Sequence, residues 1–311
     1  MKIFLDNCIN HIALKRMLPL WQKWGVKYST TPKGCDVQLS FIKISTKTEL
    51  PLVVRIDGIY YDSATNYKKR NERISEAHSK ADAVIYQSHF CRGMVERYLT
   101  PRKGSSLAKV IYNGIEKNWC GQRKQNTGFN ILTVSSWRRH KRLKEIIELF
   151  QAFRIMNGPS SLMVVGDLIE NKKQNLNDIY FYGTLDIDSD EMKYLYRQAD
   201  VFLHLSKKDC SPNVVIEAIG AGIPVITTTA CGGASEMCYM TTGCMSAIES
   251  QMPDPCKHYS DKYNILPHTT KQEMLELLKT VYNTRHRVNQ PEELSIGFMA
   301  RRYMEILRAV V

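Results

Sequence analysis

Short apolar runs alternate with longer stretches of helical periodicity along this chain of 311 residues. In its first part the runs predict strands at 2–5, 36–40, 50–56, 82–88 and 109–113. Helices predicted at 66–80 and 90–99 separate the last three of these strands. The polar, glycine-containing segment 116–128 indicates a linker. Such alternation is typical of βαβ units and of a mostly parallel sheet.

The alternation restarts after the linker. Strands are predicted at 129–136, 161–167, 179–185, 200–206 and 223–229. Helices are predicted at 141–156, 189–199, just after 211, from about 270, and at 292–309. The pattern therefore predicts an α/β protein made of two Rossmann-like halves that face each other across a cleft, with the first half short.

Composition narrows the class of protein. The chain is 43% hydrophobic and 24% charged, as soluble globular proteins are. No window approaches 18 consecutive apolar residues, and Asp6 comes too early for a signal-peptide core. Nine cysteines without a CxxC pair fit a reducing, cytoplasmic compartment. Four of them cluster but lack the tight pairs of zinc sites, so no metal is expected there: Cys231, Cys238, Cys244 and Cys256.

Positive charge is concentrated in the first part of the chain. Residues 1–125 hold 22 Lys and Arg against 10 Asp and Glu, whereas residues 126–311 hold 21 of each kind. Ordinary surface lysine would account for this excess. A binding partner that is anionic, such as a phosphoglycan, an acidic lipid surface or nucleic acid, would account for it equally well.

Ligands of parallel α/β sheets bind at the carboxyl ends of the strands, where loops enter helices. No G-x-G-x-x-G or G-x-x-x-x-G-K-[ST] motif follows a predicted strand, which argues against a dinucleotide oxidoreductase and a P-loop phosphotransferase. After the strand at 200–206, Ser211 is a suitable N-cap and Pro212 suits the first helical position. The backbone amides that follow would form a phosphate site: Asn213, Val214 and Val215.

Two acids flank these amides. Asp209 alone could be a loop residue that favours the helix dipole, and Glu217 alone could lie on a solvated helix face. Taken with the amides between them, they suit a nucleoside-diphosphate sugar. Glu217 would then accept ribose hydroxyls, and Asp209 would lie towards the sugar.

The stretch "DCSPNVVIEAIGAGIPVITTTACGGASE" resembles the E-x7-E signature of the retaining glycosyltransferases of family 4 (glycosyl transferases group 1), which have the GT-B fold. It matches at Pro212, Asn213, Glu217, Ala218, Gly222, Pro224, Val225, Ile226, Gly232, Gly233 and Glu236. The first acid is Asp209 rather than Glu, one methylene shorter. "KVIYNGIE" is similar to the segment that closes the family's first domain, and "FNILTVSSWRRHKRLKEIIELF" resembles the start of its donor domain. The resemblance is strong over 129–240, fair over 52–116 and in the last helix, and weak over 1–50.

The resemblance implies a role for each matching position of the donor domain. Lys141 stands where the family has its diphosphate-binding lysine. The partner arginine would fall on Ser136, so Arg138 or Arg139 would replace it. Gly166 would lie beside the phosphates. Backbone of Gly183, Thr184 and Leu185 would face the base, and the remaining donor contacts would come from 210–215 and Glu217, with Cys210 as the first. The family uses no metal or other cofactor, and "DIDSD" at 186–190 indicates a helix start rather than a metal motif.

The acceptor side is less clearly marked. The usual N-terminal glycine-rich loop is absent, and "KIFLDNCINH" stands in its place. Asp57, at the end of a predicted strand, is the candidate acceptor contact because the family often has a histidine or acid near this loop. A simple Asp57-Gly58 turn is the alternative. The basic run 67–73 is either a solvated helix face or a contact for anionic acceptor groups.

Three segments are predicted: an acceptor domain at 1–120, a nucleotide-sugar donor domain at 121–290, and a helix at 291–311 that crosses back towards the first domain. The predicted function is transfer of a hexosyl group, with retention, from a UDP- or GDP-sugar to a glycan, lipid-linked or other acidic acceptor. The protein would be cytoplasmic, with peripheral contact to a membrane surface as one option. The alternatives are a DNA-modifying glycosyltransferase of the same fold, an epimerase or phosphorylase on this architecture, and a non-catalytic nucleotide-sugar-binding module.

Overall fold

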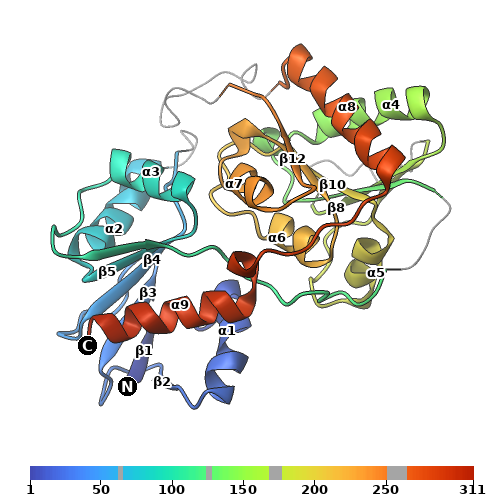
Figure 1. Cartoon of the computed structure of the whole chain (residues 1–311). Coiled ribbons are helices and arrows are strands. Elements are labelled where there is room, and N and C mark those ends of the chain that lie inside the picture. Colours follow the sequence, from blue (N-terminus) through green and yellow to red (C-terminus); the bar gives the residue numbers. More distant parts are fainter. Residues whose placement is uncertain (62–65, 124–127, 168–176, 251–264) are drawn as a thin grey trace. The chain divides into compact units, whose positions relative to one another are not determined.

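The computed structural model of the chain describes residues 1–61, 66–123, 128–167, 177–250 and 265–311. The chain forms two compact units (Figure 1). The first contains Met1–Glu116 and the C-terminal Glu292–Val311, and the second contains most of the residues between them. Each unit is built on a six-stranded sheet in which every described strand pair is parallel. The expected α/β class with two parallel sheets is confirmed.

The first sheet has the strand order β2-β1-β3-β4-β5-β6. Its strands are β1 (Lys2–Asp6), β2 (Lys27–Ser29), β3 (Val37–Phe41), β4 (Leu52–Ile56), β5 (Ala83–Tyr86) and β6 (Leu107–Val110). The helices α1 (Ile12–Lys23) and α9 (Ile296–Ala309) cover one face, and α2 (Tyr67–Lys80) and α3 (His89–Tyr98) cover the other (Figure 1). The sequence pattern predicted neither α1, which carries Pro19 inside it, nor β2, which is only three residues long.

Helix α9 completes the core of the first unit. Tyr303 of α9 and Trp21 of α1 are fully buried, and the indole Nε1 of Trp21 donates to the carbonyl oxygen of Ala300 at 3.3 Å. Gly114 lets the chain after β6 pass close to the start of α9, because a Cβ there would lie 2.5 Å from the carbonyl oxygen of Ser295. The last helix is therefore an internal part of this unit rather than an appendage.

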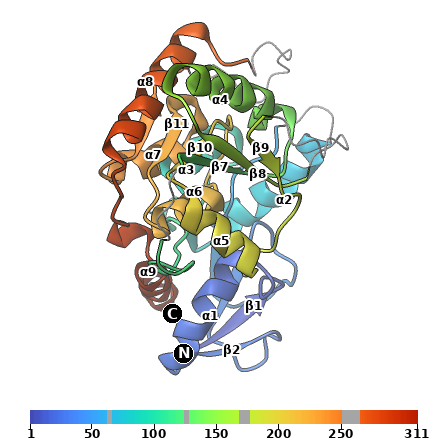
Figure 2. The ribbon, with the colours of Figure 1, turned by 90° about the vertical axis from the view of Figure 1, so that its right-hand side faces the viewer.

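The second sheet has the strand order β12-β11-β10-β7-β8-β9. Its strands are β7 (Asn130–Val134), β8 (Ser161–Val165), β9 (Ile179–Phe181), β10 (Val201–His204), β11 (Val225–Thr228) and β12 (Met245–Ala247). The helices α4 (Leu143–Asn157) and α8 (His268–Thr284) lie on one face, and α5 (Asp190–Gln198) and α6 (Asn213–Gly220) lie on the other (Figure 2). Helix α7 (Gly233–Met240) packs against β11 and β12.

The strand order places a topological switch point between β7 and β10. From β7 the chain continues to β8 on one side, and β10 then pairs with β7 on the other side. Loops that leave β7 and β10 in opposite directions create a crevice at the carboxyl ends of such strands. This is the edge of the second unit at which a ligand site is expected.

None of the helices that the structure describes is long and apolar enough to cross a membrane.

Candidate functional site

Lys141 and Asp209 meet at the switch point of the second sheet. Lys141 ends the 3₁₀-helix η1 (Arg139–Lys141) after β7, and Asp209 lies in the loop after β10. The Nζ atom of Lys141 donates to Oδ2 of Asp209 at 2.7 Å, and the two side chains are 18% and 20% exposed. The sequence assigned these residues to one site, and the fold brings them together although they are 68 positions apart.

The backbone of Asp209 is fixed by the loop after β11. Its amide donates to the carbonyl oxygen of Cys231 at 3.2 Å, and its carbonyl oxygen accepts from the amide of Gly233 at 2.9 Å. A Cβ at Gly233 would lie only 2.1 Å from the carbonyl oxygen of Cys210, so this approach requires glycine. The Gly-Gly of the sequence motif therefore acts by letting α7 start against the Asp209 loop.

The charges of the site are set by burial and by the lysine. Burial raises the pKa of Asp209, but Lys141 and the neighbouring His204 and His140 together outweigh it and hold that pKa below its ordinary value. Burial lowers the pKa of both His140 and His204 to about 4. The Nε2 atom of His204 lies 3.8 Å from Oδ2 of Asp209. At neutral pH the site thus contains an ionised aspartate, a lysine and two uncharged imidazoles.

Helix α6 starts one residue later than the sequence predicted. Pro212 occupies the N-cap position with extended backbone, Asn213 is the first helical residue, and no side chain caps the helix. The prediction of Ser211 as N-cap is therefore wrong. Among the described residues, the buried Oγ of Ser211 has no hydrogen-bond partner. The Val215 amide donates to the carbonyl of Pro212 at 3.1 Å, whereas Val214 lies in the open first turn of the helix.

Glu217 lies inside α6 and is only 5% exposed, so the interpretation as a solvated helix face is wrong. The hydroxyl of Tyr196 donates to its Oε2 at 3.3 Å, and the indole Nε1 of Trp119 donates to its backbone carbonyl at 2.8 Å. Trp119 and Tyr196 contact each other edge to face, with ring centroids 5.0 Å apart. Sequence reasoning missed both aromatics; a tryptophan inside a polar linker was the available signal.

The loops after β8 and β9 join the same edge. The amide of Gly166 donates to the carbonyl of Gly183 at 2.7 Å. Gly166 has a positive φ of 124°, and a Cβ there would lie 1.7 Å from the carbonyl oxygen of Ser135, after β7. The hydroxyl of Thr184 donates to Asp167, and Leu185 is half-buried. Three adjacent strands therefore end in loops that contact one another.

The arginine candidates lie just before Lys141. Arg138 is exposed and precedes η1, and Arg139 is exposed with its guanidinium 3.5 Å from a carboxylate oxygen of Glu145. Arg138 and Arg139 precede Lys141 by three and two positions, and their surroundings favour neither of them as the partner of the lysine.

In the first unit, Asp57 follows β4 and belongs to a charged cluster. Its Oδ1 lies 2.9 Å from Nε of the buried Arg55, and its Oδ2 lies 3.0 Å from Nε2 of His11, which caps α1. Burial raises the pKa of Asp57, but Arg55 and His11 outweigh it and lower that pKa. Arg55 also donates to Asn113 at 3.0 Å. The sequence missed His11. Gly58 has a φ of 132°, but no hydrogen-bonded turn forms at Asp57-Gly58, so the alternative of a simple turn is not what the described structure shows.

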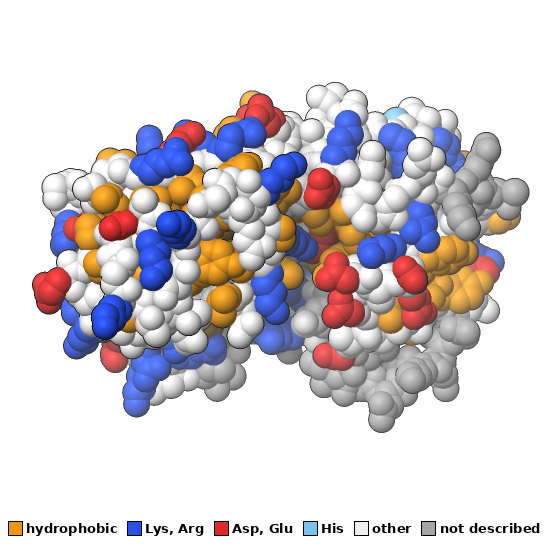
Figure 3. Space-filling model, turned by 90° about the horizontal axis from the view of Figure 1, so that it is seen from below, with side chains coloured by type: hydrophobic (Ala, Val, Ile, Leu, Met, Phe, Trp, Pro, Cys, Tyr) orange, Lys and Arg blue, Asp and Glu red, His pale blue; other side chains and the backbone are white. Residues whose placement is uncertain are grey.

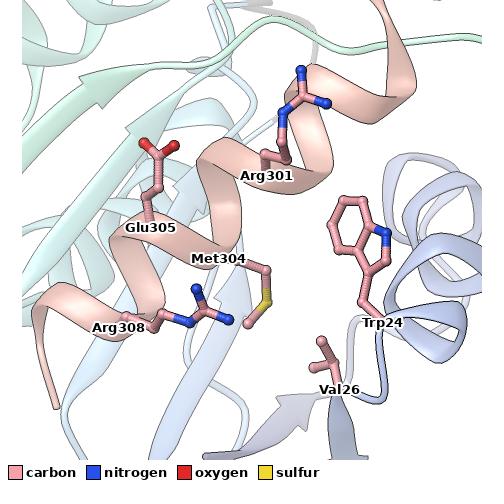
Figure 4. Close-up of a pocket in the computed structure, with 6 residues that line it drawn as sticks. All are labelled: Trp24, Val26, Arg301, Met304, Glu305 and Arg308. Carbon is pink, nitrogen blue, oxygen red and sulfur yellow. The ribbon is translucent and has the colours of Figure 1, made fainter.

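A hollow of about 490 Å³ in the first unit lies away from these residues (Figure 4). It is lined by Trp24, Val26, Arg301, Met304, Glu305 and Arg308. Trp24 ends α1 and Val26 precedes β2, so the hollow is at the amino edge of the sheet, opposite the edge of Asp57. No predicted site residue lines it.

Within the described ranges, no group of three or more His, Cys, Asp or Glu side chains is placed to hold a metal ion. Cys256, one of the four clustered cysteines, lies outside the described residues. The "DIDSD" segment starts α5, where the Oγ of Ser189 accepts from the amide of Met192 at 3.2 Å, as predicted.

Comparison with known proteins relates most of the second unit to a described protein family. Residues 117–243 match the family model "Glycosyl transferases group 1". No curated protein matches the sequence. Among solved structures, Anabaena Alr3699/HepE in complex with UDP-glucose is similar at a TM-score of 0.62 and 14% identity, covering 99% of each chain.

Two further structures extend the comparison. WaaG, a glycosyltransferase involved in lipopolysaccharide biosynthesis, gives a TM-score of 0.61 and 14% identity, over 98% of this chain and 95% of that one. The pneumococcal O-GlcNAc transferase GtfA in complex with UDP and GlcNAc gives 0.57 and 14%, over 88% of this chain but only 57% of GtfA. The chain therefore spans little more than half of GtfA. Its fold is the GT-B fold of these glycosyltransferases.

Proposed function

Starting from a GT-B fold and a second unit of the group 1 type, we propose that the protein is a glycosyltransferase of family 4 that uses a nucleotide-diphosphate sugar. The observation that carries the proposal is the Lys141–Asp209 pair at the topological switch point of the second sheet. A cation and a partly exposed carboxylate at this edge match the two parts of such a donor, an anionic diphosphate and a polyhydroxylated sugar.

Different donor-site residues contact the leaving diphosphate, the sugar and the nucleoside. Lys141, an arginine at 138 or 139, and the first amides of α6 stabilise the charge that develops on the departing diphosphate. Asp209 stays ionised and accepts hydrogen bonds from sugar hydroxyls. Glu217 accepts hydrogen bonds from the ribose hydroxyls through its carboxylate, which the hydroxyl of Tyr196 orients. The backbone of 183–185 contacts the base.

The ion pair between Lys141 and Asp209 has a further consequence for donor binding. Each is the other's partner in the free protein, so a diphosphate that recruits Lys141 releases Asp209 towards the sugar. Substituting UDP for the nucleotide sugar would leave that carboxylate without hydroxyl donors. We therefore expect the intact donor to bind more tightly than the free nucleotide.

The transfer is proposed to retain the anomeric configuration, with no dedicated base from the protein. His140 and His204 fit this scheme, because pKa values of about 4 make their imidazoles weak bases at neutral pH. Proton NMR of the first product formed would distinguish an α-linked from a β-linked sugar. Inversion relative to the donor would contradict this part of the proposal.

The acceptor is proposed to be a glycan, a lipid-linked sugar or another acidic molecule that binds the first unit through Asp57. Lys and Arg side chains predominate over acids on the face of this unit seen in Figure 3. The excess of 22 basic over 10 acidic residues in 1–125 supports an anionic acceptor or peripheral contact with an anionic membrane surface.

Thermal-shift measurements with a panel of UDP- and GDP-sugars test the donor site. At least one donor should raise the melting temperature of the wild type, and Lys141→Ala and Glu217→Ala should each reduce that shift. Lys144→Ala is the matched control, because Lys144 is an exposed lysine on α4 three residues further along. If no donor shifts the wild type, or if both site variants respond like the control, the donor-site assignment fails.

A DNA-modifying glycosyltransferase is kept as the second candidate because of the basic first unit. Its affinity for DNA should fall steeply with added salt. Absence of DNA binding at low salt would remove this candidate. Transfer of the sugar from a bound donor to an acceptor, or hydrolysis of that donor, would exclude a non-catalytic binding module.

A further inference from the structure

Glu249, which neither the motifs nor the comparisons single out, lies just after β12 at the same edge as the donor site. Its side chain is 1% exposed. Two cations are bound to it: the guanidinium of Arg142, through contacts of 2.8 and 2.5 Å, and the Nζ of Lys207 at 2.9 Å. Arg142 and Lys207 are themselves buried. One carboxylate thus connects three loops of the second sheet.

The two cations are next to the two central residues of the donor site. Arg142 directly follows Lys141, and Lys207 precedes Asp209 by two positions. The backbone also connects the loops, because the amide of Lys207 donates to the carbonyl of His140 at 3.1 Å. Holding Arg142 and Lys207 on one carboxylate therefore fixes the spacing of the Lys141 and Asp209 backbones.

Both loops contain a residue in a conformation that needs such support. Arg142 has φ of 62° and Lys208 has φ of 56°, in the left-handed region that residues with a Cβ rarely adopt. Such residues persist where the surrounding structure over-determines them. Glu249 is in turn anchored to the loop after β11, since its amide and carbonyl both bond the hydroxyl of Thr229 at 2.8 Å.

We infer that Glu249 is a positioning residue of the donor site: its buried carboxylate sets the distance between the Lys141 loop and the Asp209 loop. The inference rests on the proposed function for its ligand. The ion-pair cluster of Glu249, Arg142 and Lys207, here called the clamp, is a property of the free protein. Burial raises the pKa of Glu249, yet Arg142 and Lys207 outweigh it and lower that pKa, so the clamp is ionised at neutral pH.

The chain offers a matched control at the opposite edge of the same sheet. Asp200, just before β10, is also 1% exposed and also binds two arginines, Arg123 and Arg285. Its Oδ2 accepts from the amide of Asn130 at 2.8 Å. Asp200→Asn removes a comparable buried charge without touching the donor loops, so it isolates the general cost of breaking a buried ion pair.

The test compares Glu249→Gln with Asp200→Asn by hydrogen exchange of the free protein and by titration with UDP. Glu249→Gln should speed amide exchange in 138–142 and 205–211 and weaken UDP binding on the order of tenfold. Asp200→Asn should do neither, although both variants lose stability. If Glu249→Gln exchanges like the wild type in those loops, or if Asp200→Asn has the same effect there, the clamp is refuted.

A double-mutant cycle shows whether Glu249 acts through Lys141. In a Lys141→Ala background, Glu249→Gln should change UDP affinity by less than about twofold, because the group it positions is gone. If Glu249→Gln lowers UDP affinity equally in the wild-type and Lys141→Ala backgrounds, a positioning role is refuted. If Glu249→Gln does not fold, Lys207→Met, which leaves the Arg142 pair intact, is measured in the same way. If the wild type does not bind UDP, GDP replaces it in these titrations. Failure of the wild type to bind either nucleotide would overturn the proposed function, while the exchange data would still decide the clamp.

Discussion

Replacing Gly233 by alanine should displace the backbone beside Asp209. The new Cβ would lie 2.1 Å from the carbonyl oxygen of Cys210, and real contacts of this kind are essentially never shorter than 3.0 Å, so a shift of about 0.9 Å is required. The obstructing atom belongs to the backbone and cannot rotate away. Gly233 does not have a positive φ, so the strain is purely steric.

The shift has two measurable costs. Overpacking at a rigid contact lowers stability by about 1–3 kcal/mol. Displacing a positioned group by about 1 Å can cost on the order of 100-fold, or about 2.7 kcal/mol. Because Asp209 is proposed to hold the sugar, we expect Gly233→Ala to lose most of its affinity for the nucleotide sugar at a temperature where it is still folded.

Isothermal titration with the nucleotide sugar that the thermal-shift panel identifies, and thermal unfolding of the free protein, measure these effects. Gly93→Ala in α3 is the control, because nothing lies within 4 Å of a Cβ there and the residue is in a helix. This control should be unchanged or more stable by about 0.5–1 kcal/mol. Wild-type affinity for the nucleotide sugar in Gly233→Ala would refute the argument that the Asp209 loop is held by this close contact.

Three further predictions follow from the second unit. His204 has a pKa of about 4 when folded against 6.5 ordinarily, so the unfolded chain binds more protons in between and stability should fall, by up to about 3 kcal/mol, as pH drops through that window. Urea midpoints at about pH 7 and pH 5 should differ less in His204→Gln; an equal difference would contradict this. Tyr196→Phe, which removes the hydroxyl bonded to Glu217, should weaken UDP binding by about 1 kcal/mol in titrations, with uridine diphosphate lacking the ribose 2′-hydroxyl much less affected. Transfer should persist in excess EDTA, and loss of activity that Mg²⁺ restores would show that the expected metal independence is wrong.

The sequence predicted the sheets well because the buried parallel strands are continuous apolar runs. Their observed ends differ from the predicted ones by a few residues, as at β6, which is Leu107–Val110 rather than 109–113. Helix α1 was missed because Pro19 normally argues against a helix, yet here it occurs inside one. Ser211 was misjudged for the opposite reason: a residue with high capping preference stands one position too early.

Apart from the family resemblance, which joined Lys141 to Asp209, the sequence related site residues to one another only within one local stretch. Asp209 and Glu217 are eight positions apart, so their relation could be read along the chain. Glu249 pairs with Arg142 across 107 positions, and His11 with Asp57 across 46, and no spacing rule connects such residues. Their partners become apparent only when the parallel sheets bring the carboxyl ends of distant strands to one edge.

The position of α9 has a consequence for the order in which the protein can form during synthesis. The first unit begins with the residues that leave the ribosome first, but its core needs Ile296, Met299 and Tyr303 from the last helix to be made. The second unit has all its strands available earlier. Vectorial synthesis therefore favours folding of the second unit while one face of the first sheet is covered by α1 alone. A nascent chain that stalls before residue 292 would expose the rest of that face to chaperones, although its second unit could already be native.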